Sequence, residues 1–478
     1  MNTINTITLV WIALPFFLGF SSYLLPRFDR ALALGVGFVS MAYGLLNLFN
    51  PADVTLELLD SFGVTLRIDS LSGFFILTNA IVTAAVALYC WHRQQSAFFY
   101  TQTILVHGSV NAAFICADFI SLYVALEVIS IASFLLIAYT RSTRSIWVGL
   151  RYLFVSNTAM LFYLIGAVMV YQANQSFAFS GLVNAPIEAI ALIFVGLLTK
   201  GGIFVSGLWL PLTHSEAETP ASAMLSGVVI KAGVFPLVRC ALMFESIDPV
   251  VRLFGVATAL LGVGYAVFEK DAKRMLAFHT VSQLGFVLAA PEVGGFYAMT
   301  HGLVKAALFL IVGNLPSRNL KELRSHTLPT SIWIALAIAS FSISGFPLLS
   351  GFGAKVLTMK NLLPWQVIGM NIAALGTAIS FAKFIFLPHG GEGHLKPGFW
   401  PAMSLLLGGL ILANGIYYEA YTVSNIVKPL VTIAIGWIAY WLIFRNIVVK
   451  LPRMMEQFDH LIGVMSLVLA GLCWMVVT

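Results

Sequence analysis

The sequence predicts an all-α protein embedded in a membrane, with 14–16 transmembrane helices. The first observation is the composition, because 59% of the 478 residues are hydrophobic and only 10% are charged, which lies outside the range of soluble domains. The second is the recurrence of apolar stretches from Thr6 to Val477, each near the roughly 20 residues that a helix needs to cross a bilayer. The third is the shortness of the polar breaks, which leave no room for a soluble domain.

The expected helices can be placed in order along the chain from these apolar stretches. The last two have the weakest pattern. The expected stretches are 7–25, 31–49, 71–91, 99–116, 118–139, 147–171, 186–209, 221–243, 249–268, 275–290, 296–314, 328–349, 364–388, 399–417, 428–445 and 460–477.

The chain is expected to divide into four parts: an N-terminal three-helix segment with an outer hairpin (1–98), a first repeat (99–245), a second repeat (246–390) and C-terminal helices (391–478). The hairpin is expected because Val54–Asp60 and Gly63–Asp69 alternate apolar and polar residues around a turn at Ser61–Gly63, as paired strands do.

The charges of the loops predict the orientation. Lys and Arg are concentrated in alternate loops, for example Arg27 with Arg30 and Lys270 with Arg274, whereas the intervening loops are poor in both. The positive-inside rule then places both termini outside the cytoplasm, and we expect a bacterial inner (plasma) membrane. The net charge of +6 is spread over these loops without a basic, aromatic-rich cluster, so no nucleic-acid partner is expected.

The four cysteines predict neither a metal site nor a disulfide framework. Cys90, Cys116, Cys240 and Cys473 lie in or beside apolar stretches, and none forms a CxxC pair. The chain also lacks a nucleotide, flavin or iron–sulfur motif. We therefore expect no cofactor and no metal, and any redox chemistry would have to come from partner chains.

Charged residues inside the apolar stretches are the strongest indication of function. A charge at the centre of a bilayer costs a few kcal/mol by insertion scales, so it persists where it is paired, hydrated or functional. Six such groups in one chain indicate a polar path through the membrane for protons or small cations. The six are Glu127, Lys200, Lys231, Lys305, Lys355 and Lys383.

Two of the expected helices are broken, and the breaks repeat. Lys200-Gly201-Gly202 interrupts the seventh stretch, and Ser344–Lys355, rich in Gly and Pro, interrupts the twelfth. Freed backbone groups are tolerated at membrane depth only against protein or a water-filled cavity. Because the two breaks are five stretches apart, the sequence predicts two inverted five-helix repeats, each with a broken helix, as in many transporters.

The residue types suit proton transfer. Lysine can release a proton when desolvation lowers its pKa, and a nearby glutamate can act as the counter-ion that keeps it charged. We therefore expect Glu127 to pair with Lys200 or Lys231. His301 and Lys305 lie one helical turn apart on one face and could form a relay step between the halves.

For two further residues a structural role carries equal weight. Lys383 could extend to the membrane interface, and His279 could be a hydrogen-bonded packing residue. We expect His214, Glu216 and Glu218 to lie in a loop, either solvated or facing a partner, rather than to bind a metal.

Several segments together resemble the antiporter-like membrane subunits shared by Mrp-type cation/proton antiporters and respiratory complex I. The resemblance covers roughly residues 50 to 390 and is closest to the D-type subunit of Mrp antiporters, through Ser226–Arg239. The other matching segments are Leu122–Glu127, Trp209–Pro211 with Thr219–Ala223, Lys270–Ala277 with Ser282–Gly285, and His301–Phe309.

The resemblance implies a 14-helix core of two inverted five-helix units joined by a central polar axis. It also implies the roles of the residues: Glu127 and Lys200 form the pair of the first unit and Lys231 links inward. His301 and Lys305 lie on the central axis, and Lys355 serves the second unit. The long lateral helix of the distal complex I subunit is not expected, because the chain ends soon after the core. The stretches Leu212–Glu218 and Phe352–Lys355 depart from the sequence pattern of the D-type subunit.

The sequence therefore predicts a proton/cation-translocating subunit of a multisubunit Na⁺(K⁺)/H⁺ antiporter, with other hydrophobic subunits as partners, including a paralogous one. Three alternatives stay open. One is a proton-pumping subunit of complex I or a related membrane hydrogenase, in which case the chain belongs to an NADH:quinone oxidoreductase without its own redox cofactor. The others are a subunit that energises bicarbonate uptake and a structural scaffold.

Overall fold

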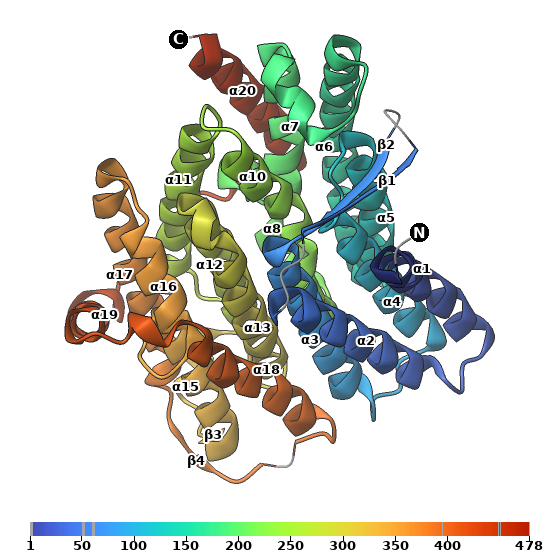
Figure 1. Cartoon of the computed structure of the whole chain (residues 1–478). Helices are drawn as coiled ribbons and strands as arrows, with labels where there is room; N and C mark the ends of the chain where they lie inside the picture. Colours follow the sequence, from blue (N-terminus) through green and yellow to red (C-terminus); the bar gives the residue numbers. More distant parts are fainter. Residues whose placement is uncertain are drawn as a thin grey trace.

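The structure is a computed structural model of the whole chain, and it describes residues 3–49, 53–59, 63–393, 395–447, 449 and 451–477. The chain folds into a bundle of long helices, with the N-terminal helices on one side and the second-repeat helices on the other (Figure 1). Within the described residues, twelve helices are long and apolar enough to cross a membrane, and two more apolar helices are shorter. The expected all-helical membrane architecture is confirmed. The twelve long helices and two shorter ones stand against the 14–16 transmembrane helices that were expected.

The first half of the chain contains the hairpin and ten helices. Asp69, Asp118 and Ser142 cap helices α3, α5 and α6 by accepting a backbone N–H three residues on, as N-cap side chains do. The helices are α1 (Thr3–Leu24), α2 (Asp29–Phe49), α3 (Ser70–Cys90), α4 (Ala97–Ala113), α5 (Phe119–Ile137), α6 (Thr143–Asn174), α7 (Ile187–Lys200), α8 (Leu210–Glu216), α9 (Thr219–Met224) and α10 (Lys231–Met243). Short 3₁₀ turns η2 (Phe179–Asn184) and η3 (Phe204–Gly207) and a π-helical turn η4 (Leu225–Val229) lie between them.

The second half ends in the C-terminal helices. Its helices are α11 (Asp248–Phe268), α12 (Ala272–Ala289), α13 (Gly294–Val312), α14 (Leu320–Leu323), α15 (Thr330–Ser344), α16 (Ser350–Lys360), α17 (Val367–Ile385), α18 (Phe399–Ala413), α19 (Val423–Ala439) and α20 (Phe458–Val477). The turns are η5 (Pro291–Val293), η6 (Pro364–Gln366), η7 (Asn414–Ala420), η8 (Tyr440–Phe444) and η9 (Met454–Glu456), and the short strands β3 (Leu328–Pro329) and β4 (His389–Gly391) pair in parallel.

The expected hairpin is confirmed. Strands β1 (Val54–Leu59) and β2 (Gly63–Ile68) pair antiparallel, with Val54 opposite Ile68. Ser61 and Phe62 of the predicted turn lie outside the described residues, as do Asp60 at the end of the first predicted strand and His394 and Lys450 of the loops.

Helix α13 forms the centre of the bundle. Every residue of α13 is buried, and the helix packs against α3, α12, α15, α16 and α18. A helix that is buried all round contacts protein on every side, so any polar group on α13 faces other helices and not lipid.

Both expected breaks are present. Helix α7 ends at Lys200, and Gly202 follows with φ +66°. Helix α15 ends at Ser344, Gly345 adopts φ +86°, and the chain resumes as α16 at Ser350. Positive φ favours glycine, which accounts for glycine at both breaks. The inverted relation of the two repeats and the four-part division of the chain remain predictions.

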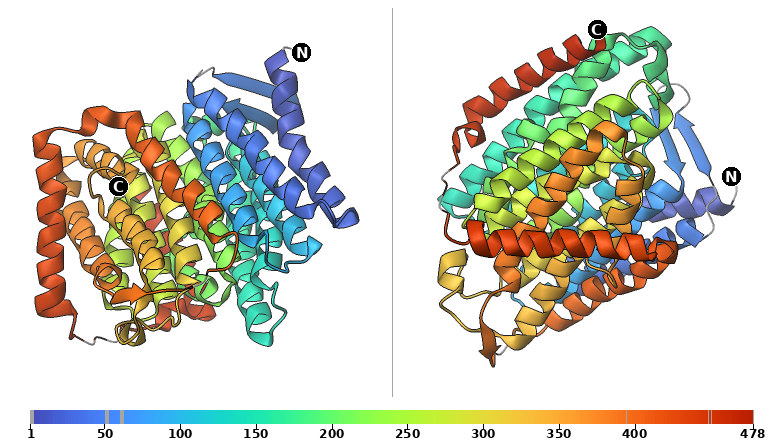
Figure 2. Two further views of the ribbon diagram at one scale, coloured as in Figure 1. Left: turned by 90° about the horizontal axis from the view of Figure 1, so that it is seen from below. Right: turned by 90° about the vertical axis from the view of Figure 1, so that its left-hand side faces the viewer.

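The C-terminal helices differ from the expectation. Figure 1 shows α19 end-on, although α17 and α20 are seen from the side, so α19 lies across the bundle; Figure 2 shows the same helix along its length. The chain then returns, and α20 packs on α6 and α7 of the first half. The expectation excluded only the long lateral helix of the distal complex I subunit; the crosswise position of α19, a helix of 17 residues, was not expected. Composition alone did not reveal it, because Val423–Phe444 is apolar enough to cross a membrane.

Candidate functional site

Lys200 lies at the C-terminal end of the broken helix α7, among hydroxyl groups of two neighbouring helices. Its Nζ donates to Leu126 O at 3.1 Å, to Ser156 Oγ at 2.6 Å and to Ser130 Oγ. The side chain is 4% exposed. A buried ammonium requires such acceptors, so α5 and α6 supply the polar environment that keeps Lys200 inside the bundle.

Glu127 lies on α5, next to a residue that binds Lys200. Its carboxylate makes no ion pair within 4.0 Å in the described part of the chain, and Oε1 is buried without a hydrogen-bond partner there. Glu127 and Lys200 interact electrostatically over a longer distance, whereas Lys231 shows no such interaction with Glu127. Of the two partners expected for Glu127, the structure places Lys200 nearer.

Lys231 is the first residue of α10 and follows the π-helical turn η4. A π-turn shifts the register of the backbone hydrogen bonds, and here the carbonyl oxygens of Ser226 and Gly227 accept from Lys231 Nζ at 3.2 and 2.6 Å. The side chain is fully buried. The sequence showed the lysine, but it did not show the π-turn that supplies its acceptors.

The break after Lys200 and helix α10, which begins at Lys231, contact each other at glycine residues. A Cβ added at Gly233 would lie 2.8 Å from Cα of Gly201 and 2.8 Å from the carbonyl carbon of Lys200. No side chain fits there, so α10 passes against the break of α7 at backbone distance.

His301 and Lys305 lie on the buried helix α13. Nζ of Lys305 donates to Leu276 O and lies 5.2 Å from the centroid of Phe309. Neither ring nitrogen of His301 has a hydrogen-bond partner in the described part, and the ring interacts electrostatically with Lys231 and Lys305. His301 therefore interacts with one lysine on its own helix and with one on α10.

Lys355 lies on α16, beyond the second break. Its Nζ is buried, has no hydrogen-bond partner among the described residues, and lies 5.4 Å from the centroid of Phe286. We call Lys200, Lys231, His301, Lys305 and Lys355 the buried polar axis. It runs from the first break through α13 to the second.

His279 and Lys383 lie beside this axis. His279 has no hydrogen-bond partner within the described chain, and it interacts electrostatically with Lys305, Lys355 and Lys383. Lys383 lies in the last turn of α17, where its Nζ donates to the carbonyl oxygens of Ala266, Val267 and Glu269 at 3.2, 2.7 and 3.0 Å. A cation there complements the C-terminal end of α11, which is compatible with the structural role that the sequence left open for Lys383.

Buried hydroxyl groups without a partner in the described part accompany both breaks. Buried polar groups in native proteins are satisfied by protein or by ordered water, and water occupies polar sites of this kind. The surroundings of Lys200 and Lys355 are therefore suited to hydration. The groups are Ser133, Tyr152 and Thr199 on α5–α7, and Ser340, Ser342, Ser350 and Thr358 on α15 and α16.

Other buried polar groups escaped the sequence reasoning. The expectation that His214 is a solvated or partner-facing loop residue is wrong: it lies on α8, is 1% exposed and stacks on Phe309 with ring centroids 5.1 Å apart. His107 on α4 is also buried and bonds Ser40 and Thr83 at 2.8 and 2.9 Å. Hydrophobic periodicity gave no signal for either, because the neighbours that bury them are distant in sequence.

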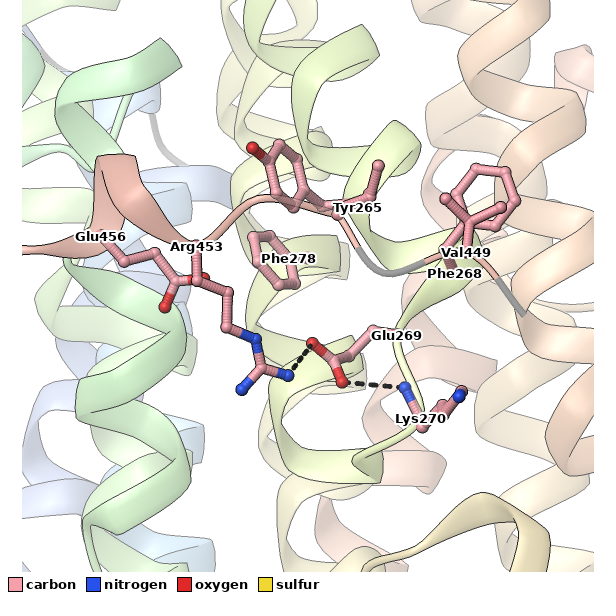
Figure 3. A pocket seen from close by; sticks show the side chains of 9 residues that line it. Tyr265, Phe268, Glu269, Lys270, Phe278, Val449, Arg453 and Glu456 are labelled. Carbon is pink, nitrogen blue, oxygen red and sulfur yellow. Dashed lines mark hydrogen bonds and ion pairs between the residues drawn. The ribbon is translucent and has the colours of Figure 1, made fainter.

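A charged cluster closes one end of the second half. Figure 3 shows Glu269 between Arg453 and Lys270 beside a cavity of about 370 Å³. The carboxylate of Glu269 pairs with Arg274 at 3.3 Å and Arg453 at 3.5 Å, and Arg274 binds Glu456 at 2.7 Å. These pairs tie the segment before α20 to α12. Among the described residues, no group of three or more His, Cys, Asp or Glu side chains could hold a metal ion.

Comparison with known families gives a match over the region that contains the axis. The family model described as "NADH:quinone oxidoreductase/Mrp antiporter, TM" matches residues 116–380. The chain is 26% identical to the D-type subunit of a Na⁺/H⁺ antiporter from Alkalihalophilus pseudofirmus, over 82% of this chain and 89% of that protein. It is 27% identical to the N-type subunit of an NADH-quinone oxidoreductase from Desulforudis audaxviator, over 79% of this chain and 85% of that one.

Two solved structures share the fold. A chain of the Mrp complex from Dietzia sp. aligns with a TM-score of 0.78 and 24% identity over 98% of this chain, which spans 59% of that chain. A chain of an archaeal membrane-bound sulfane sulfur reductase aligns with a TM-score of 0.76 and 19% identity, over 89% of this chain and 99% of the other.

Proposed function

Because the chain belongs to the NADH:quinone oxidoreductase/Mrp antiporter membrane family, we propose that it is the proton/cation-translocating subunit of a multisubunit Mrp-type Na⁺(K⁺)/H⁺ antiporter. It is an integral membrane protein and an antiporter-like subunit. The observation that carries the proposal is the buried polar axis, which places four lysines and a histidine between two helix breaks.

Each residue of the axis would hold a proton in turn. Lys200 holds it among hydroxyl groups, with Glu127 as a distant counter-charge. When Glu127 is neutralised or moves, the ammonium loses stabilisation, since an opposite charge favours the charged form. The proton then passes inward toward Lys231, and His301 relays it to Lys305.

The proton continues from Lys305 to Lys355 along the second half. His279 interacts with both lysines, which supports a role for it in this step. Water is expected to bridge the gaps, since polar contacts beyond about 3.5 Å are often water-mediated.

The second candidate is a proton-pumping subunit of a complex I-type assembly or a membrane hydrogenase. The 27% identity to an N-type NADH-quinone oxidoreductase subunit supports it about as strongly as the 26% identity to a D-type antiporter subunit supports the first. The two candidates differ in their partner chains: further hydrophobic subunits with a paralogue for the antiporter, and soluble redox subunits for the pump. For either, we propose that both termini lie outside the cytoplasm, with the Glu269–Arg453 cluster on the cytoplasmic side.

Identification of the partners tests this choice. The complex would be purified gently through a tag on this chain and weighed intact by mass spectrometry. Small hydrophobic subunits with a second antiporter-like chain, followed by Na⁺- or K⁺-dependent pH changes in vesicles, are the expected result. Co-purifying flavin or iron–sulfur subunits would refute the antiporter assignment.

Substitution of the axis tests the translocation role itself. Glu127→Ala and Lys231→Ala should each abolish ion-coupled transport and leave the assembled complex intact. Full transport in both variants would instead favour a structural scaffold.

A further inference from the structure

A cavity of about 230 Å³ lies beside Lys355, between α16, α17 and the crosswise helix α19. None of the described residues that line it is acidic, whereas three are lysines. Its polar lining comes from four helices: Ser344 on α15, Lys355 and Lys360 on α16, Asn371 on α17, and Asn425, Lys428 and Thr432 on α19.

Lys355 differs from the other lysines inside the bundle in having no acceptor. Lys200, Lys231 and Lys383 each donate to two or more oxygen atoms. The Nζ of Lys355 has no hydrogen-bond partner in the described chain, although the side chain is only 6% exposed. A buried ammonium without an acceptor is strongly disfavoured, so the charged form of Lys355 needs acceptors from outside the chain.

We propose that this cavity binds a phosphate-type oxyanion. The ammonium groups of the three lysines can donate to its oxygen atoms, and hydrogen bonds between charged groups are the stronger kind. The amides of Asn371 and Asn425 each donate one N–H to a backbone carbonyl and keep a second for the anion. The volume of the cavity is several times the roughly 30 Å³ that one water molecule occupies in the liquid, so a polyatomic anion fits.

The anion has two sources with the same chemistry: free phosphate, or the headgroup of an anionic lipid. Lys428 is exposed on α19, and Val431 and Ile435 on the same helix are also exposed. A lipid with its phosphate at Lys428 would have apolar side chains beside its acyl chains.

The bound anion gives Lys355 the counter-charge that Glu127 gives Lys200. It also joins α16 to α19 through a shared ligand, so α19 senses whether the anion is present. The second half would then depend on an anion where the first half depends on a carboxylate of the chain itself.

Binding measurements on the delipidated, assembled complex test the site in two arms. In the first, titration calorimetry compares sodium phosphate with sodium chloride at equal ionic strength. In the second, native mass spectrometry compares lipid retention by complexes from nanodiscs of phosphatidylglycerol and of phosphatidylcholine. Neither arm measures transport, so the site can fail while the proposed function stands, and the reverse.

Lys428→Glu is the informative variant, because it places a negative charge in the cavity. Lys396→Glu, an exposed lysine outside this lining, makes the same charge change and is the matched control. Lys428→Gln covers the case in which the charge reversal prevents assembly.

The expected result is binding that weakens at least about tenfold in the Lys428 variants, because a hydrogen bond to a charged group contributes about 1.5 kcal/mol or more, and that is unchanged in Lys396→Glu. If the Lys428 variants lose phosphate binding in the first arm, the ligand is free oxyanion. If they lose only lipid retention in the second arm, the ligand is a lipid headgroup. No binding by the wild type in either arm, or equal binding by wild type and Lys428 variants, would overturn the proposal.

Discussion

Removal of the hydroxyl groups around Lys200 tests how the first half of the axis holds a proton. Nζ of Lys200 donates to Ser156 Oγ at 2.6 Å and also to Ser130 Oγ. A hydrogen bond to a charged group contributes about 1.5–3 kcal/mol, and water can replace part of it. At the lower value, Ser130→Ala should destabilise the charged lysine by about 1.5 kcal/mol, which is roughly tenfold in an equilibrium constant.

The assay is proton-coupled cation transport in vesicles that contain the purified complex. Each single variant should slow transport by about tenfold, and the double variant with Ser156→Ala by up to about a hundredfold if the two bonds act independently. Ser109→Ala is the matched control, because Ser109 is buried but bonds only to carbonyl groups of its own helix. Equal rates in the double variant and in Ser109→Ala would refute the reasoning that these hydroxyls stabilise the charged lysine.

Three further predictions concern stability and packing. Glu456→Gln weakens the ion pair with Arg274, and thermal unfolding should show that the protein loses about 3 kcal/mol of stability or less. Breaking a buried pair costs about 3–5 kcal/mol, but Arg274 keeps its second partner Glu269. An unchanged unfolding midpoint would contradict this. Burial by itself raises the pKa of Glu269. Hydrogen bonds from backbone N–H groups and the charge of Arg274 lower it by more, so the pKa of Glu269 is lowered overall. The stability that the Glu269 carboxylate contributes is present above the unfolded pKa of about 4.3 and is lost as the pH falls. Glu269→Gln should therefore lose less stability than the wild type on acidification. Parallel curves of stability against pH for the two proteins would rule this out. Gly233→Ala should separate α10 from Gly201 and lower both the unfolding temperature and transport, whereas Gly264→Ala, at a site open on all sides, should change neither.

The membrane architecture could be predicted from the sequence because its signals are local. Apolar length marked the helices, and glycine beside a lysine marked the break at Lys200. The alternation of Val54–Leu59 and Gly63–Ile68 marked the hairpin. Each of these properties is decided within a single helix or hairpin, so no tertiary information was needed.

The missing parts depend on contacts between distant segments. The acceptors of Lys231 come from a π-turn, which no residue pattern announced. His214 is buried by α13, far along the chain at Phe309, and the sequence could not show that neighbour. Helix α19 has the composition of a transmembrane helix, but it lies across the bundle and packs mainly on α17 (Figure 2).

The most direct test of the central claim is proton movement through the assembled complex with Lys231 changed to Met, which keeps most of the length of the side chain and removes its charge. The measurement is the decay of an imposed pH gradient in vesicles on addition of Na⁺ or K⁺, with subunit composition checked by mass spectrometry. The buried polar axis predicts that the complex stays intact and that cation-driven decay is lost. Decay at the wild-type rate in an intact complex would contradict a proton path through Lys231.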